Sequence, residues 1–257
     1  MIDLPAEVFG LISDYFWHGF LVFLRVSALV SVLPAFGERA VPVRVKLVLA
    51  IAFGAIVAPA APFLTLPKSP LAFAGFAAPE VVTGLALGLA IRLFVLALQT
   101  AGSIAAQATS LSQLLGGAAV EPVPAMGYVL VIGALALAVM TGLHVRAAEL
   151  LILSYDLFPP GKWPDGQSLA AWGVTRISHA FSLAFMLAAP FVVASLIYNL
   201  ALGVINRAMP QLMVAFVGAP LITFGGLFLL FVCAPFMLTV WVEALNEFFR
   251  NPTQVSG

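Results

Sequence analysis

The chain has 257 residues, of which 63% are hydrophobic and only 9% are charged. Soluble domains carry roughly 45–50% apolar and about 25% charged residues, so this composition excludes an ordinary water-soluble protein. The 11 basic and 11 acidic residues are scattered singly and give a formal net charge of zero. No basic stripe is present, which argues against nucleic acid as a partner.

Long stretches without Asp, Glu, Lys or Arg recur along the chain, at residues 47–67, 93–120, 122–145, 177–206 and 208–242. Crossing the hydrocarbon core of a bilayer takes about 20 apolar residues of helix. The alternating pattern of a membrane barrel is missing, so the sequence predicts an all-α, multi-helix integral membrane protein. We expect one membrane domain over residues 1–257, with apolar helices at about 15–36, 45–62, 71–98, 125–155, 172–203 and 211–243.

The positions of the basic residues do not fix the topology. A basic first loop at residues 39–46 favours the cytoplasm, whereas Arg146, Lys162 and Arg176 fall around a later loop that simple alternation would place outside. Two interpretations remain open. Either some apolar helices are hairpins that pack on protein instead of lipid, or the charge signal is merely weak.

Three ionisable residues, Arg25, Glu80 and Arg92, lie within or beside apolar helices, where such residues are expensive and are often functional. Glu80, Gly84, Gly88 and Arg92 are spaced by four, which places them on one face of a helix. Glu80 and Arg92 are about 18 Å apart along an ideal helix, so each needs a partner elsewhere. Small residues on such a face favour close helix packing, and we interpret the face as a subunit contact, with an ion path as the alternative.

The segment Ala101 to Pro124 is rich in Gly, Ala and Ser and has few long apolar side chains. Such a segment can line or plug a cavity, because irregular backbone at membrane depth is tolerated only where protein or water surrounds it. A plain connecting loop explains the composition equally well. The candidate pore or plug residues are Gln107, Ser110, Ser112, Gln113, Leu114, Leu115, Gly116 and Gly117.

Signatures of enzymes, cofactors and metal sites are missing from the sequence. His18, His144 and His179 are isolated, and Cys233 is the only cysteine. No HExxH, GxSxG or Gly-rich phosphate loop is present. We therefore predict no catalytic residues, no cofactor and no metal.

The segment GVINRAMPQLMVAFVGAP, from Gly203 to Pro220, has a distinctive order: an apolar helix, then Asn206-Arg207, then Pro210-Gln211, then a second apolar run. It closely resembles the signature of the FliR family of flagellar type III export proteins. The basic turn PAFGERAVPVRVKLVLA and the aromatic end of LILSYDLFPPG agree in the same order. We expect Asn206, Arg207, Pro210 and Gln211 to form a structural joint between two long helices, since Arg207 can donate to open carbonyls and Pro210 can start a helix.

The resemblance implies a set of helical hairpins that assemble into a heteromeric export gate. FliP-type and FliQ-type subunits would complete the conduit, with FlhB-type and FlhA-type components nearby, and unfolded flagellar proteins would pass through it. The place would be the bacterial inner membrane, in the flagellar basal body. The family's plug matches Ala105 to Glu121, a segment in which the largest side chains of this sequence include Leu114 and Leu115.

Two alternatives to a flagellar export gate remain from the sequence. Injectisome gate subunits share the fold of the FliR family. A small-solute transporter or channel would also be built of apolar helices, and its marks would be repeated halves around a midplane site. We find no convincing internal repeat in the chain.

Overall fold

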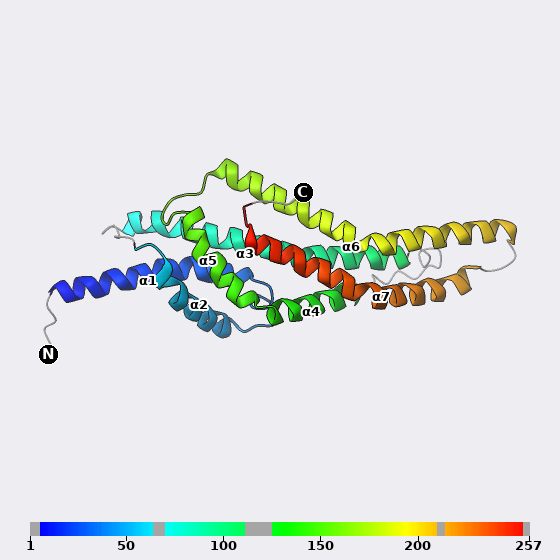
Figure 1. The fold of residues 1–257 in the computed structure, drawn as a ribbon, viewed down its shortest axis with the longest axis horizontal. Coiled ribbons are helices and arrows are strands. Elements are labelled where there is room, and N and C mark those ends of the chain that lie inside the picture. The colour runs from blue at the N-terminus through cyan, green and yellow to red at the C-terminus, as the bar shows by residue number, and fades with distance from the viewer. Residues whose placement is uncertain (1–5, 64–69, 111–124, 210–213, 254–257) are drawn as a thin grey trace. The chain divides into compact units, whose positions relative to one another are not determined.

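A computed structural model describes residues 6–63, 70–110, 125–209 and 214–253. Among these residues the regular elements are helices, without a strand, which confirms the predicted all-α fold class (Figure 1). In chain order they are α1 (Ala6–Val32), α2 (Val43–Val57), the short 3-10 helix η1 (Ala58–Ala60), α3 (Pro70–Ser110), α4 (Ala125–Met140), α5 (Leu143–Leu157), α6 (Gly166–Ala208) and α7 (Val214–Arg250).

Helix α3 is longer than predicted, because it runs to Ser110 instead of ending near residue 98. The prediction ended the helix where Gly, Ala and Ser begin to dominate. In the structure these small residues allow close helix packing. A Cβ atom on Gly102 would collide with the main chain of Gly127 in α4, so the two backbones can come this close only because position 102 lacks a side chain.

The single helix predicted at residues 125–155 is two helices, α4 and α5, with a break after Met140. Gly142 lies in this break with φ of +85°, a left-handed conformation that costs glycine little and other residues much more. The other predicted helices are present, with ends that differ by up to a few turns.

The chain forms two compact units. Unit 1 comprises Met1–Arg92 and Val139–Arg176, and unit 2 comprises Leu93–Ala138 and Ile177–Gly257. Helices α3 and α6, and α4 with its last two residues, contribute to both units. The single membrane domain therefore stays a prediction.

Each unit has its own apolar core. In unit 1 one face of α1 is fully buried, with Val26 and Leu29 inaccessible to solvent, and Phe53 and Val57 of α2 are buried with it. In unit 2 the buried side chains come from α3, α4, α6 and α7, and they include Leu98, Leu130, Leu183 and Trp241. The indole Nε1 of Trp241 donates a hydrogen bond of 2.8 Å to the carbonyl oxygen of Phe94, so its polar atom is satisfied inside the apolar core.

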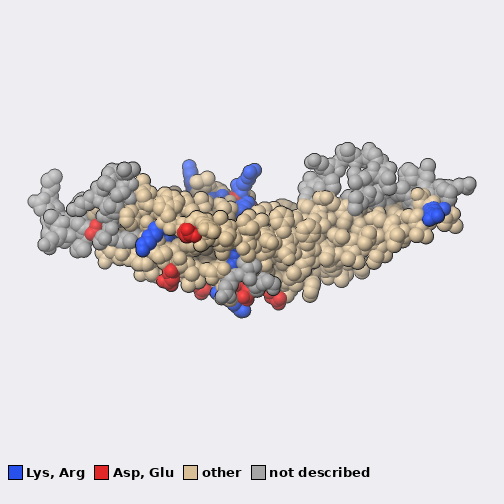
Figure 2. All heavy atoms as spheres, turned by 90° about the horizontal axis from the view of Figure 1, so that it is seen from above, with Lys and Arg blue, Asp and Glu red and all other residues tan. Residues whose placement is uncertain are grey.

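The outer surface suits a membrane. Within the described residues five helices are long and apolar enough to cross one, and the pair α4–α5 makes a sixth if it counts as one span. Large apolar side chains point outward on α7, where Phe231 is 79% exposed and Phe236 is 72% exposed. In the view of Figure 2 most of the visible surface carries no charged side chain, and most of the charged side chains lie near one another over part of it. The chain is a multi-helix membrane protein.

Candidate functional site

The most conspicuous polar site of unit 1 is a buried ion pair between α1 and α3. The Nε of Arg25 donates to Oε2 of Glu80 at 2.8 Å, and its Nη2 donates to Oε1 at 3.2 Å. Both side chains are 1% exposed. This two-pronged geometry matches the planar guanidinium to the carboxylate, and it gives both charges the partner that the sequence analysis required without identifying it.

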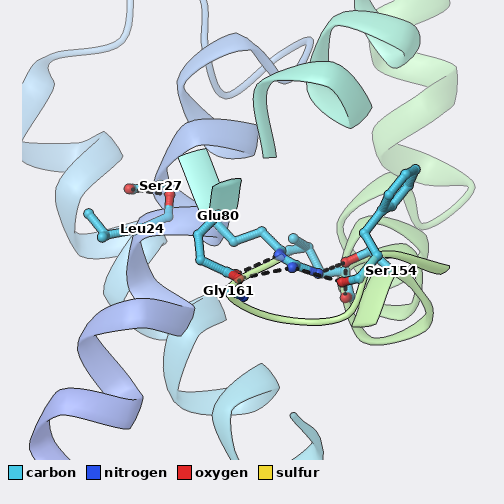
Figure 3. Close-up of polar contacts among 8 residues, drawn as sticks. Leu24, Ser27, Glu80, Ser154 and Gly161 are labelled. Atoms are coloured by element: carbon cyan, nitrogen blue, oxygen red, sulfur yellow. Dashed lines mark hydrogen bonds and ion pairs between the residues drawn. The ribbon is translucent and has the colours of Figure 1, made fainter. Parts of the chain in front are cut away.

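Further groups complete the shell of this ion pair. Arg25 also donates to Oγ of Ser154 and to the carbonyl oxygen of Phe158, each at 3.0 Å. The N–H of Gly161 donates to Oε1 of Glu80 at 2.9 Å. The Arg25 guanidinium lies 3.9 Å from the centre of the Tyr155 ring, a favourable cation–π position. Figure 3 shows Glu80, Ser154 and Gly161 gathered around these contacts.

The role of this cluster is structural. A buried charge is costly unless it is paired and its remaining hydrogen-bonding groups are satisfied, and here α1, α3, α5 and the turn after α5 all supply partners for Arg25 or Glu80. Both carboxylate oxygens are engaged, which leaves no free acid or base for a reaction. The cluster therefore joins four segments of unit 1.

Sequence reasoning missed Ser154, Phe158 and Gly161 as members of this cluster. The only sequence signal was the turn motif Pro159-Pro160-Gly161. Gly161 has φ of +70°, and a side chain there would collide with the ring of Phe76. Glycine is therefore required on two grounds, the backbone conformation and the lack of space.

The four residues predicted to share a helix face all lie against α1. Glu80 binds Arg25, and a Cβ on Gly84 would collide with the Arg25 carbonyl oxygen. A Cβ on Gly88 would lie 2.9 Å from the Leu29 carbonyl oxygen, and Nη1 of Arg92 lies 3.5 Å from the Val32 carbonyl oxygen. The face thus packs inside this chain. A contact of the same residues with another subunit stays a prediction.

In unit 2 the predicted pore segment begins as regular helix. Gln107 is exposed in the last turns of α3, and the helix ends at Ser110. The side chain of Ser110 and the residues Ser112, Gln113, Leu114, Leu115, Gly116 and Gly117 lie outside the described residues. The structure therefore describes the base from which the segment starts.

Neutral hydrogen bonds hold this end of α3. Oγ of Ser195 in α6 donates to the Ala108 carbonyl oxygen at 2.6 Å, one of the last carbonyls of α3, which have no partner within the helix. Nδ2 of Asn199 donates to the same Oγ at 3.1 Å. Gly226 of α7 lies so close to Thr109 that a Cβ would come within 2.5 Å of its Cγ2 atom. Helices α6 and α7 therefore fix the last turn of α3.

The predicted joint between the two long C-terminal helices is described in part. Asn206 and Arg207 are exposed in the last turn of α6, while Pro210 and Gln211 lie outside the described residues. A contact that the sequence did not suggest ties the two helices near this joint: the Tyr198 hydroxyl donates to the Gly218 carbonyl oxygen at 2.6 Å. The role of the joint stays a prediction.

In the described part of the chain the titratable side chains do not gather into a candidate metal site. No group of three or more His, Cys, Asp or Glu side chains gathers there. His18 lies 3.0 Å from the Ala58 carbonyl oxygen and stacks on Phe63, which are packing contacts.

Comparison with known proteins gives a consistent result over nearly the whole chain. The profile of the bacterial export proteins, family 1, matches residues 16–248. The chain is 34% identical over 231 residues to the flagellar biosynthetic protein FliR of Caulobacter vibrioides, which covers 88% of this chain and 92% of that protein. It is 31% identical over 257 residues to the protein of that name in Escherichia coli (97% and 95% covered) and 29% identical over 247 residues to that in Bacillus subtilis (92% of each). The chain therefore belongs to the FliR family of bacterial export proteins.

Proposed function

We propose that this chain is a subunit of the flagellar type III protein export gate in the bacterial inner membrane. FliP-type and FliQ-type subunits complete the conduit, FlhB-type and FlhA-type components lie beside it, and unfolded flagellar proteins pass through. The observation that carries the proposal is the family match over residues 16–248, which covers all or most of each candidate membrane span in the described residues. The relatives compared here are all flagellar proteins by name, which favours the flagellar system over an injectisome.

The surface of unit 2 supports assembly with other apolar chains. Exposed Phe224, Phe228 and Phe231 follow one another on α7, and Leu196 and Leu200 are exposed on α6. Contiguous apolar surface of this kind marks an interface with protein or lipid. A gate subunit needs both, since it meets partner subunits on some faces and the bilayer on others.

The segment from Gln107 to Gly117 lines or blocks the export path in the resting gate. The support is the construction of its base. Helix α3 holds its regular structure up to Ser110 because Ser195 and Gly226 fix its last turn, so the segment starts from a rigid platform. Its neutral polar side chains can face water without trapping ions, and Gly116 and Gly117 allow the backbone to move aside.

A coexpression experiment tests the role of the chain. The chain is produced with its FliP-type and FliQ-type partners in a strain that lacks its own FliR, and export of flagellar proteins is measured together with copurification of the three chains. We expect a stable complex and restored export. A protease-resistant monomer that never copurifies with these partners would contradict the proposal.

Deletion of residues 110–117 tests the role of the segment. The complex should still assemble, because little apolar surface is lost, but ion leakage through the membrane should rise. A cysteine at Ser110 or Ser112 should crosslink to a stalled substrate. A cysteine at the exposed Gly75 of α3 in unit 1, where nothing lies within 4 Å of an added Cβ, should not. If leakage is unchanged and neither serine position crosslinks to the substrate, the segment is only a connecting loop and does not line or block the export path.

A further inference from the structure

Unit 2 contains an apolar cavity of about 290 Å³ between the end of α3 and the facing sides of α6 and α7. Thr109 lines it from α3, Phe191, Ser195 and Tyr198 from α6, and Leu221 and Phe228 from α7. The cavity does not belong to the ion-pair cluster of unit 1. Of the segment from Gln107 to Gly117, Thr109 lines the cavity, and it is not one of the candidate pore residues. Its chemistry identifies what can occupy it.

The polar atoms in the cavity wall already have hydrogen-bond partners. The hydroxyl of Thr109 donates to main-chain carbonyls of its own helix at 3.0–3.2 Å. The hydroxyls of Ser195 and Tyr198 donate to the carbonyl oxygens of Ala108 and Gly218, each at 2.6 Å. No hydroxyl proton is left for a ligand, and a polar group that enters such a cavity loses its hydrogen bonds to water without compensation. The occupant must therefore be apolar.

The cavity opens onto a surface that has no charge. Leu221 and Phe228 line the cavity and are also 57% and 61% exposed. Neither residues 177–206 of α6 nor residues 214–242 of α7 include Asp, Glu, Lys or Arg. Each of these charge-free helical stretches is long enough to reach across the hydrocarbon core, so the mouth of the cavity lies on an apolar surface that suits lipid.

We propose that this cavity binds an acyl chain of a membrane phospholipid. A water molecule takes up about 30 Å³ of the liquid, and a methylene group takes up a similar volume, so the cavity holds roughly ten carbons of a chain. A protein partner is the weaker candidate, because protein interfaces carry about one hydrogen bond per 100–200 Å² and this wall offers no free hydroxyl donor. Acyl-chain binding requires that unit 2 contacts lipid, whereas the export role does not require a bound lipid. An experiment can therefore rule out acyl-chain binding and leave the export role intact.

Photolabelling in native membranes tests the proposal on the assembled complex. A phospholipid with a diazirine near the end of one acyl chain is incorporated, activated by light, and mapped by mass spectrometry. We expect labels on residues 191–198 and 221–229 that clearly exceed labels on the exposed Phe181 and Phe185 of α6. Equal labelling of the two places would overturn the proposal.

Matched variants then separate cavity binding from general contact with lipid. Ala194 lines the cavity, whereas Ala189 is exposed on the same helix outside it. In Ala194→Trp the ring fills the space of the chain, and labelling of residues 221–229 should fall by about fivefold or more, while Ala189→Trp should leave it unchanged. Gly225→Leu is a second cavity-filling variant, since no atom lies within 4 Å of an added Cβ there. An equal loss of label in the cavity and control variants, or a photocrosslinker at Leu221 that captures a partner subunit instead of lipid, would show that the cavity is not a lipid site.

Discussion

The two units of this chain solve the problem of burying polar groups in different ways. Unit 1 buries the full charges of Arg25 and Glu80 and surrounds them with donors and acceptors. Among its described buried side chains unit 2 uses neutral donors, namely the hydroxyls of Thr109 and Ser195 and the indole N–H of Trp241, which donate to main-chain carbonyls. A broken ion pair leaves an uncompensated charge, whereas a broken neutral hydrogen bond costs about 1–3 kcal/mol at most. The ion pair of unit 1 therefore holds its helices in one arrangement. In unit 2 the loss of one polar contact destabilises the fold less.

The largest expected effect comes from breaking the ion pair of unit 1. In Glu80→Ala the guanidinium of Arg25 stays buried without its counter-charge, and the Gly161 N–H loses its acceptor. The free energy of unfolding should fall by about 3–5 kcal/mol, which thermal unfolding of the purified complex measures. The double variant Arg25→Met with Glu80→Leu is the control, because it removes both charges and should recover most of the loss. A single variant as stable as the double variant would show that the pair does not lock unit 1.

The next effect tests the close approach of α1 and α3. In Gly84→Ala the new methyl group meets the Arg25 carbonyl oxygen and the Cβ of Ala28, so the helices must separate. Overpacking of this kind costs about 1–3 kcal/mol. Gly203→Ala is the matched control, since nothing lies within 4 Å of its added Cβ in α6, and it should stabilise the helix slightly. Equal yields of assembled complex from the two variants would contradict the packing argument.

These residues also show what a sequence can and cannot predict here. The fold class followed from the lack of charge over long stretches, and the shared face of Glu80, Gly84 and Gly88 followed from their spacing. The partner of Glu80 was not predictable, because Arg25 is 55 residues away in the chain and the pairing depends on how α1 lies on α3. The true end of α3 was missed because small residues that weaken an isolated helix are the ones that let Gly102 meet Gly127.

A comparable effect is expected where unit 2 holds the end of α3. Ser195→Ala removes the donor to the Ala108 carbonyl oxygen, and a buried acceptor without a partner costs about 1–3 kcal/mol. Hydrogen exchange of the amides of residues 101–110 should become faster, and ion leakage through the complex should rise, because the base of the pore segment loosens. Thr239→Ala is the control: its hydroxyl bonds only within α7 and is exposed, so little should change. If both variants behave alike, Ser195 does not fix the helix end.

The smallest effect concerns the start of α6, where Asp165 caps the helix. The Ser168 N–H donates to Oδ2 of Asp165 at 2.8 Å. Two hydrogen bonds from Ser168 hold the pKa of Asp165 below its usual value. The one from the side chain has the larger effect, and the one from the main-chain N–H has the smaller. A lowered pKa in the folded chain means that the charged carboxylate stabilises the helix start above the unfolded pKa of about 3.9 and that this contribution is lost as the pH falls through the lower, folded value.

At pH 7, hydrogen exchange of the Ser168 amide should therefore be faster in Asp165→Ala than in the unmodified chain. The difference should shrink progressively as the pH is lowered below about 3.9, because protonation then weakens the same cap in the unmodified chain. Asp165→Asn keeps a neutral acceptor at this position, so it should retain protection of the Ser168 amide and lose its pH dependence. A difference between the unmodified chain and Asp165→Ala that stays the same from pH 7 down to pH 2 would show that the charge of Asp165 plays no part in capping α6.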